Sequence, residues 1–223
     1  MRTLNKELQQ QITPAQTLEI LKEGNKRFVS NLKYNRNLLE QVNDTRDGQW
    51  PIAAILSCID SRTSAELIFD QGLGDIFSIR IAGNIVNEDI LGSMEFACGV
   101  AGSKFIVVLG HTKCGAIKGA CDHVQLGNLT HLLSKIEPSV QAETETKENR
   151  SSANSVFVEN VANINVHKAV KEILEKSPIL KDLIDQGKVG IVGAMYDVTS
   201  GKVEFYEDAK VVNINPAVAE SVA

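Results

Sequence analysis

Short apolar runs alternate with amphipathic segments through the first half of the chain. Short, mainly apolar runs, each of a length that suits a strand, cover residues 51–57, 75–81 and 104–109. The stretches between them, 64–70 and 87–102, have the apolar spacing of helices. Strands that alternate with helices usually lie parallel and are covered on both faces. The pattern therefore predicts an α/β fold with a central, mainly parallel β-sheet flanked by helices.

The N-terminal region predicts a helix followed by a polar connection. Thr13 is a good N-cap, Pro14 suits the first helical position, and Gln16 stands where a capping box requires it. We therefore expect a helix from residue 14 onward, with its apolar positions on one face. Residues 31–50 are polar, and we expect them to form an arm that connects this helix to the sheet.

The second half of the chain predicts further helices and a final pair of strands. Thr199, Ser200 and Gly201 separate two apolar runs, which is the pattern of a β-hairpin. We expect helices at 114–122, 128–136 and 153–176, a polar loop or a fraying helix end at 138–152, and hairpin strands at 189–196 and 202–206. The length of 223 residues suits one large domain or two small ones.

Composition and charge exclude several classes of partner. A net charge of −5, no basic patch and an aromatic content of 5% argue against nucleic acid. No apolar run approaches the roughly 20 residues that cross a bilayer, and the N-terminal residues lack the apolar stretch of a signal peptide. We therefore expect a cytoplasmic protein that does not bind membranes. In that compartment the four cysteines are expected to be metal ligands, catalytic groups or buried thiols rather than disulfides.

Two short motifs carry the candidate chemistry, and each begins where an expected strand ends. The first is Cys58-Ile59-Asp60-Ser61-Arg62, and the second is His111-Thr112-Lys113-Cys114-Gly115. Because ligands of open α/β sheets bind at the carboxyl ends of strands, the two motifs can converge on one point. Thiolate and imidazole are the ligands that zinc prefers, so Cys58, His111 and Cys114 predict a zinc site. Three protein ligands leave a fourth position open, as in catalytic zinc sites.

Asp60 could fill that fourth position, but Arg62 offers it a competing partner. A carboxylate and a guanidinium can form a bidentate pair of defined geometry. If Arg62 holds Asp60 away from the metal, water occupies the fourth position and Asp60 can orient it. Two thiolates cancel the charge of the metal, so its water should be less acidic than at a three-histidine site, where the pKa is about 7. We therefore expect activity that rises toward alkaline pH.

Each of these features has an ordinary structural explanation when it stands alone. A cysteine at a strand end is commonly a buried thiol, and an Asp-x-Arg pair commonly lies on the surface and contributes little stability. Their joint occurrence at two strand ends is what favours a metal site. We expect the remaining cysteines to be core thiols and the remaining histidines to be solvated or structural: Cys98, Cys121, His123, His131 and His167.

The CIDSR and HTKCG motifs resemble the zinc signatures of the β-class carbonic anhydrases, C-x-D-x-R and H-x-x-C. The resemblance extends over most of the chain. It implies a single domain over residues 1–223, with an N-terminal helical arm (1–50) that reaches over a partner subunit. It also implies a zinc-binding α/β core (51–223) whose parallel sheet has an added antiparallel edge strand. The expected assembly is a homodimer that can pair into a homotetramer.

The resemblance also implies the reaction and the residues that perform it. The expected reaction is the reversible hydration of carbon dioxide to bicarbonate and a proton, through a zinc-bound hydroxide, with one Zn²⁺ per subunit. Cys58, His111 and Cys114 match the family's metal ligands. Asp60 and Arg62 match its catalytic dyad, in which the arginine keeps the aspartate away from the metal.

Five further residues match the family's substrate pocket. Gln49 matches a glutamine that binds bicarbonate across the dimer interface in plant-type members. Phe77 and Phe96 match aromatic positions of the carbon dioxide pocket, and Phe96 replaces a tyrosine of plant-type members. Ala82 stands where valine is usual, and Gly115 would offer a backbone N–H to a bound anion. The resemblance therefore predicts a narrow and largely apolar pocket.

The family has a second type, in which bicarbonate at a non-catalytic site drives the aspartate onto the zinc. That site uses a tryptophan three residues before the first cysteine, where this chain has Ile55. Arg80 matches another part of that site but also occurs in the unregulated type. We therefore expect the plant-like, open-zinc type without this inhibition.

Three other interpretations stay open at this point. The first is a structural zinc protein with Asp60 as a permanent fourth ligand. The second is a metal-free cysteine hydrolase that uses Cys114 or Cys58 with Asp60 and Lys113. The third is a relative within the family that hydrolyses carbon disulfide or a similar small molecule. Metal analysis and an assay of carbon dioxide hydration distinguish these interpretations.

Overall fold

A five-stranded mixed sheet forms the centre of the protein. The structure, a computed structural model, describes residues 3–207. The strand order is β2-β1-β3-β4-β5, with β1 to β4 parallel and β5 antiparallel to β4. The strands are β1 (Ala53–Ser57), β2 (Ile76–Arg80), β3 (Phe105–His111), β4 (Gly190–Tyr196) and β5 (Val203–Phe205). The predicted α/β class, the mainly parallel sheet and the antiparallel edge strand are confirmed.

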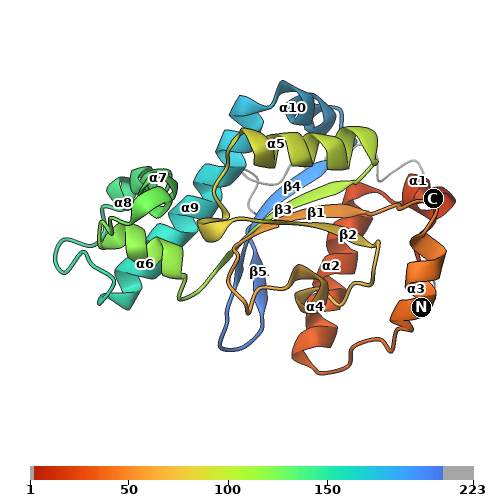
Figure 1. The fold of residues 1–223 in the computed structure, drawn as a ribbon, viewed down its shortest axis with the longest axis horizontal. Coiled ribbons are helices and arrows are strands. Elements are labelled where there is room, and N and C mark those ends of the chain that lie inside the picture. The colour runs from red at the N-terminus through yellow and green to blue at the C-terminus, as the bar shows by residue number, and fades with distance from the viewer. Residues whose placement is uncertain (1–2, 208–223) are drawn as a thin grey trace.

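Helices cover both faces of this sheet (Figure 1). Helix α9 packs against β3 and β4 on one face, together with α5, α6 and α10, while α2 and α4 cover the other. The helices are α1 (Lys6–Gln11), α2 (Pro14–Val29), α3 (Leu38–Thr45), α4 (Ala65–Ile68), α5 (Glu88–Glu95), α6 (Gly115–Cys121), α7 (Gly127–Ser134), α8 (Glu137–Ala142), α9 (Ser155–Lys176) and α10 (Pro178–Asp185). Two short elements are a 3₁₀ turn, η1 (Ala82–Asn84), and a π-helical turn, η2 (Phe96–Val100).

Burial explains why the central strands read as continuous apolar runs. Every residue of β1, β3 and β4 is buried, because helices lie on both faces of these strands. Strand β2 lies at the edge, and there buried, half-buried and exposed residues alternate. The parallel register places Ser57 of β1 opposite Leu109 of β3 and His111 opposite Tyr196 of β4. The carboxyl ends of β1, β3 and β4 therefore lie at one edge of the sheet.

The sequence pattern did not locate two of the helices. Residues 31–50, expected as a connecting arm, include α3, which Asn37 caps, and residues 138–152, expected as a loop or a fraying helix end, begin inside α8. Helix α3 buries only Gln41 and leaves Leu38 and Leu39 exposed. It therefore lacks the buried apolar face by which an amphipathic helix is recognised in a sequence. Helix α8 has only 6 residues, which is too short for a periodic pattern to be recognised.

Two other helix boundaries differ from the prediction. The helix expected over 87–102 ends as α5 at Glu95 and continues as the π-helical turn η2. Helix α10 was not predicted, although Ser177 caps it and Pro178 opens it, which are ordinary start signals. Within residues 3–207 no helix is both long and apolar enough to cross a bilayer. The proposed extent of the domain, residues 1–223, includes residues 1–2 and 208–223, which lie outside the described part.

Candidate metal centre

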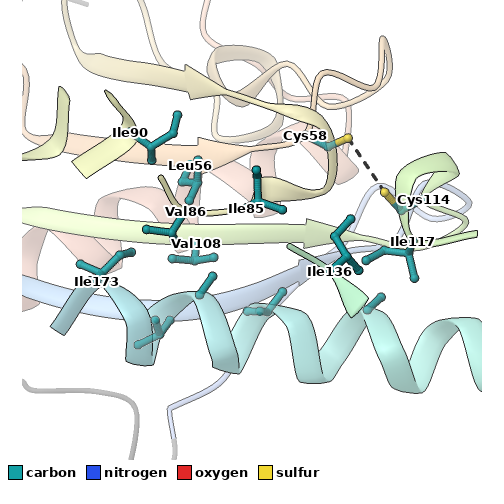
Figure 2. Close-up of a cluster of buried hydrophobic side chains, with 14 of the residues drawn as sticks. Leu56, Cys58, Ile85, Val86, Ile90, Val108, Cys114, Ile117, Ile136 and Ile173 are labelled. Carbon is teal, nitrogen blue, oxygen red and sulfur yellow. Dashed lines mark hydrogen bonds between the residues drawn. The ribbon is translucent and has the colours of Figure 1, made fainter. Parts of the chain in front are cut away.

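The two motifs converge at the carboxyl edge of the sheet. Cys58 directly follows β1, His111 is the last residue of β3, and Cys114 caps the N-terminus of α6. Because β1 and β3 are neighbouring parallel strands, these segments leave the sheet side by side. The ligand atoms of all three side chains lie within 4.8 Å of one another. The two sulfurs are 3.9 Å apart, and a dashed line joins them in Figure 2. The predicted convergence of the three side chains is confirmed.

The ring of His111 is oriented so that one nitrogen is free to bind a cation. Its Nδ1 lies 2.9 Å from the carbonyl oxygen of Thr112. A carbonyl can only accept, so Nδ1 carries the proton and Nε2 keeps its lone pair. Nε2 is buried and has no hydrogen-bond partner among the described residues. A buried, unpaired imidazole nitrogen beside two sulfurs is the arrangement expected of a metal ligand.

The two thiols differ sharply in acidity because their sulfurs are adjacent. The hydrogen bond with Cys114 lowers the pKa of Cys58, and His111 and the backbone N–H of Gly83 lower it further against the effect of burial. The hydrogen bond with Cys58 and burial raise the pKa of Cys114. Two thiolates at this distance repel each other, so a proton or a cation is needed between them. A divalent cation allows both to ionise, and the donor set of two sulfurs and one imidazole fits zinc.

Asp60 is held by Arg62 and by the backbone. Arg62 donates from Nε to Oδ1 at 2.9 Å and from Nη2 to Oδ2 at 2.8 Å, which is a bidentate pair. The backbone N–H of Arg62 donates to Oδ1 as well, at 3.0 Å. The Arg62 guanidinium holds the pKa of Asp60 well below its usual range. The carboxylate is therefore ionised, and both of its oxygens already accept hydrogen bonds within its own loop.

Hydrogen bonds from Arg80 and Thr63 hold the loop that carries Cys58 and Asp60. Arg80 of β2 donates from Nε to the carbonyl of Cys58 at 3.0 Å and from Nη2 to the carbonyl of Asp60 at 2.6 Å. The hydroxyl of Thr63 lies 3.0 Å and 2.8 Å from the same two carbonyls. Cys58 and Asp60 are thus fixed relative to the sheet edge by both a neighbouring strand and the turn that follows them.

Comparison with known proteins agrees with this site. The family model described as carbonic anhydrase matches residues 53–203. Carbonic anhydrase 2 of Mycobacterium tuberculosis is 34% identical over 195 residues, which cover 85% of this chain and 91% of that protein. The solved structure of the β-carbonic anhydrase CcaA is 27% identical and superposes with a TM-score of 0.67, covering 86% of this chain and 95% of that one. The chain belongs to the β-carbonic anhydrase family.

The Coccomyxa β-carbonic anhydrase, solved in complex with acetazolamide, shares this fold. Its TM-score is 0.69 at 22% identity, over 92% of this chain and 99% of that one. At this level of identity the likeness bears on the fold alone, and it agrees with the mixed sheet flanked by helices that this chain forms.

The expected pocket residues of this β-carbonic anhydrase lie in several places. Phe77 of β2 and Phe96 of η2 form an edge-to-face pair with ring centroids 6.2 Å apart. Ala82 lies in η1, beside Gly83, whose N–H contacts the sulfur of Cys58. Gly115 opens α6 directly after Cys114 and has open space around its Cα. Ala82 and Gly115 therefore adjoin metal ligands in the chain, through Gly83 and Cys114, whereas the role of the Phe77–Phe96 pair in a substrate pocket stays a prediction.

Gln49 lies apart from the ligands in the single chain. It is exposed and lines a surface hollow together with residues of α3 and of the turn before β2. No metal-ligand residue lines this hollow. Gln49 is expected to bind bicarbonate at the site of a second subunit. A single chain does not test this role, which stays a prediction.

Sequence reasoning missed the contacts that hold the His111–Cys114 turn. Thr112 donates from its hydroxyl to Asp197 at 3.2 Å, and Glu159 of α9 accepts from the backbone N–H of Lys113 at 2.9 Å. Lys113 has a positive φ of 57°, and its Nζ lies 3.2 Å from the Thr199 hydroxyl rather than at a thiol. The Asp197 contact follows from the register of β3 with β4, which the sequence alone does not reveal.

Proposed function

We propose that this carbonic anhydrase interconverts carbon dioxide and bicarbonate at one Zn²⁺ per subunit, held by Cys58, His111 and Cys114. The observation that carries the proposal is the convergence of two sulfurs and an unpaired imidazole nitrogen within 4.8 Å, beside a carboxylate that its own arginine holds. Bound zinc with one open position lowers the pKa of a coordinated water and so supplies a nucleophile near neutral pH. Residues of the chain orient the water, bind carbon dioxide and stabilise bicarbonate.

Asp60 orients the attacking oxygen. Its pKa is low and its position is fixed by Arg62, so it can accept a hydrogen bond from the attacking water but cannot donate one. This hydrogen bond fixes the O–H group of the water toward Asp60, so that a lone pair of the water oxygen points toward carbon dioxide. The new C–O bond yields bicarbonate, and the proton released from the water passes to buffer.

The residues around Gly83 and the Phe77–Phe96 pair form the substrate wall. Carbon dioxide offers little to hydrogen-bond, so the two rings and Ala82 suit it. Charge develops only as bicarbonate forms, and the backbone N–H of Gly115 is available to it. Gln49 of a second subunit would supply a further polar contact to bicarbonate.

We propose that the subunits form a homodimer, which can pair into a tetramer. Within residues 3–207, edge strand β2 is paired on one side only, and Phe96 and Val100 of η2 are 51% and 74% exposed. Large apolar side chains exposed beside a free sheet edge support an interface between copies of the chain. We also place the enzyme in the cytoplasm, because all four cysteines are free thiols.

We further propose that the enzyme is of the open-zinc type. The two oxygens of Asp60 are occupied by Arg62, and Ile55, where the bicarbonate-inhibited type has tryptophan, is a fully buried strand residue. Arg80 is engaged with the carbonyls of Cys58 and Asp60. A crystal structure at neutral pH with Asp60 on the metal would overturn this part of the proposal.

The decisive experiment is stopped-flow carbon dioxide hydration on protein of known zinc content. We expect turnover in proportion to zinc, loss of turnover on chelation and recovery on adding zinc back. Stoichiometric zinc without turnover would indicate a structural site. Hydrolysis of a carboxylic ester that continues after the metal is chelated would indicate a cysteine hydrolase. Hydrolysis of carbon disulfide without hydration of carbon dioxide would indicate the related hydrolase.

A further inference from the structure

A buried amide on α9 is linked to the ligand Cys58 through a single glycine. The sulfur of Cys58 accepts a hydrogen bond from the backbone N–H of Gly83, with 3.4 Å between nitrogen and sulfur. The carbonyl oxygen of Gly83 accepts from Nδ2 of Asn165 at 2.8 Å. We propose that Asn165 is a positioning residue of the metal centre, which fixes the N–H that Gly83 presents to the Cys58 sulfur.

The conformation of Gly83 makes it dependent on its neighbours. It lies in η1 with φ 66° and ψ 18°, a left-handed conformation that glycine adopts readily. A Cβ at this position would come within 2.6 Å of Ile136 Cδ1 and 3.3 Å of Ala116 Cβ. Ile136 itself lies among the apolar side chains next to the two sulfurs (Figure 2). Gly83 is therefore confined on one side by apolar packing and held on its carbonyl by Asn165.

The orientation of the Asn165 amide is fixed in turn by Ser139 of α8. The Ser139 hydroxyl donates to Oδ1 of Asn165 at 3.1 Å, so the NH₂ group is the one that faces Gly83. Asn165 is 3% exposed and Ser139 is fully buried. The neighbouring buried positions of α9 are apolar members of the main cluster: Val161, Ala162, Val166 and Ala169. A buried amide among them is costly unless it is hydrogen-bonded, and its two hydrogen bonds connect α8 to Gly83 of η1.

The chain of contacts gives Asn165 a specific effect on the metal centre. A hydrogen bond to a ligating sulfur reduces the electron density that the sulfur can donate to the metal and fixes the orientation of the sulfur lone pairs. Without the Asn165 contact, Gly83 can rotate, and the sulfur becomes a stronger but less well placed donor. This inference rests on the proposed function, because it takes Cys58 as a metal ligand.

Cobalt substitution of the full-length protein tests the inference without measuring turnover. In Asn165→Leu we expect the sulfur-to-cobalt charge-transfer band to move to longer wavelength. We also expect the dissociation constant for zinc, measured against a competing chelator, to rise about tenfold. The matched control is Val170→Ala, which is also buried on α9 but faces Gly193 rather than η1. Both quantities should stay at wild-type values in this control.

The outcomes separate the inference from the proposal on which it rests. If Asn165→Leu is destabilised like Val170→Ala but keeps the wild-type band and zinc affinity, Asn165 is only structural and the inference fails. If Asn165→Leu does not fold, Ser139→Ala must shift the band in the same direction by a smaller amount, and an unshifted band overturns the inference. A wild-type protein that binds cobalt without any sulfur charge-transfer band would contradict the proposed metal centre instead.

Discussion

Asp60 and Arg62 are joined by three hydrogen bonds although only one residue separates them. Two come from the guanidinium, one to each carboxylate oxygen, and the third comes from the backbone N–H of Arg62. Only 17% of the Asp60 side chain is exposed, against 48% of the Arg62 side chain. The pair therefore presents an ionised and immobile carboxylate beside the metal ligands, and the geometry favours orienting an oxygen over binding a cation.

Asp60→Asn should keep zinc but lose most turnover. An amide of the same size can still meet Arg62 in part, but it presents its NH₂ group where the carboxylate would accept a hydrogen bond. We expect kcat for carbon dioxide hydration to fall roughly 100-fold, the lower end of what a positioned acid–base group contributes. Stopped-flow assays with zinc quantified in the same sample measure this. Asp44→Asn, which changes an exposed carboxylate bonded to Thr3, is the control, and equal activity of the two variants would remove Asp60 from the mechanism.

Cys58→Ala should lose zinc and activity together. One imidazole and one thiolate remain, and Nε2 of His111 and the Cys114 sulfur would then lack the third ligand that a stable zinc site needs. Cys98→Ala is the matched control, because Cys98 is also buried but lies outside the cluster of ligands. Zinc measured by atomic emission after dialysis should fall below about 0.1 per subunit in the first variant and stay near one in the control. Full zinc in Cys58→Ala would show that the metal binds elsewhere.

Turnover should rise with pH and reach a plateau on the alkaline side. Because Arg62 lowers the pKa of Asp60, this carboxylate is already ionised at pH 5 and contributes no step above it. The rise then reports the water at the metal, whose pKa should exceed the value of about 7 found at three-histidine sites. Measured kcat between pH 6 and 9.5 should follow a single ascending curve. A bell-shaped profile, or a fall with rising pH, would contradict this assignment.

The sequence predicted the site more completely than it predicted the helices around it. Cys58 and His111 were identifiable because their chemistry is unusual and because each lies at the end of an apolar run that indicates a buried strand, and Cys114 follows His111 by three residues. Parallel strands place such ends at one edge, so convergence followed from topology. Short helices such as α3 and α8 bury too few apolar side chains to leave a pattern.

Contacts that depend on register or on distant packing were not predictable. Asp197 reaches Thr112 only because His111 pairs with Tyr196 in the sheet, and Asn165 reaches Gly83 only because α9 packs against the sheet at β3. An asparagine or aspartate in isolation carries no sign of its partner. The polar groups that hold the ligand loops therefore became visible only in three dimensions.

Asp70→Ala should destabilise the protein by about 3 kcal/mol. The Asp70 side chain is 2% exposed and pairs with both Arg27 of α2 and Arg36, which ties the N-terminal region to α4. Burial opposes ionisation, but the two guanidiniums hold the pKa of Asp70 below its usual range. This stabilisation is present above the ordinary pKa of about 3.9 and is lost as pH falls through the lower, folded-state value. Urea unfolding of wild type and Asp70→Ala at pH 7 measures the decrease in the free energy of unfolding.

The control for this variant is Asp47→Ala. Asp47 also pairs with an arginine, Arg46, but the two side chains are 85% and 70% exposed. Its removal should change the free energy of unfolding by less than about 0.5 kcal/mol. If Asp70→Ala costs no more than Asp47→Ala, the buried pair does not anchor the N-terminal region.

Phe96→Glu should dissociate the proposed dimer. Phe96 packs against Phe77 of the edge strand and still exposes 51% of its surface, so a partner subunit seated on β2 would bury it. A carboxylate buried there without a cation is strongly unfavourable, and the dissociation constant should rise at least tenfold. Leu126→Glu is the control, because Leu126 is 66% exposed and precedes α7 at the opposite end of the molecule (Figure 1). Sedimentation velocity should show a monomer for Phe96→Glu and a dimer for the control, whereas a dimer of Phe96→Glu would place the interface on another face.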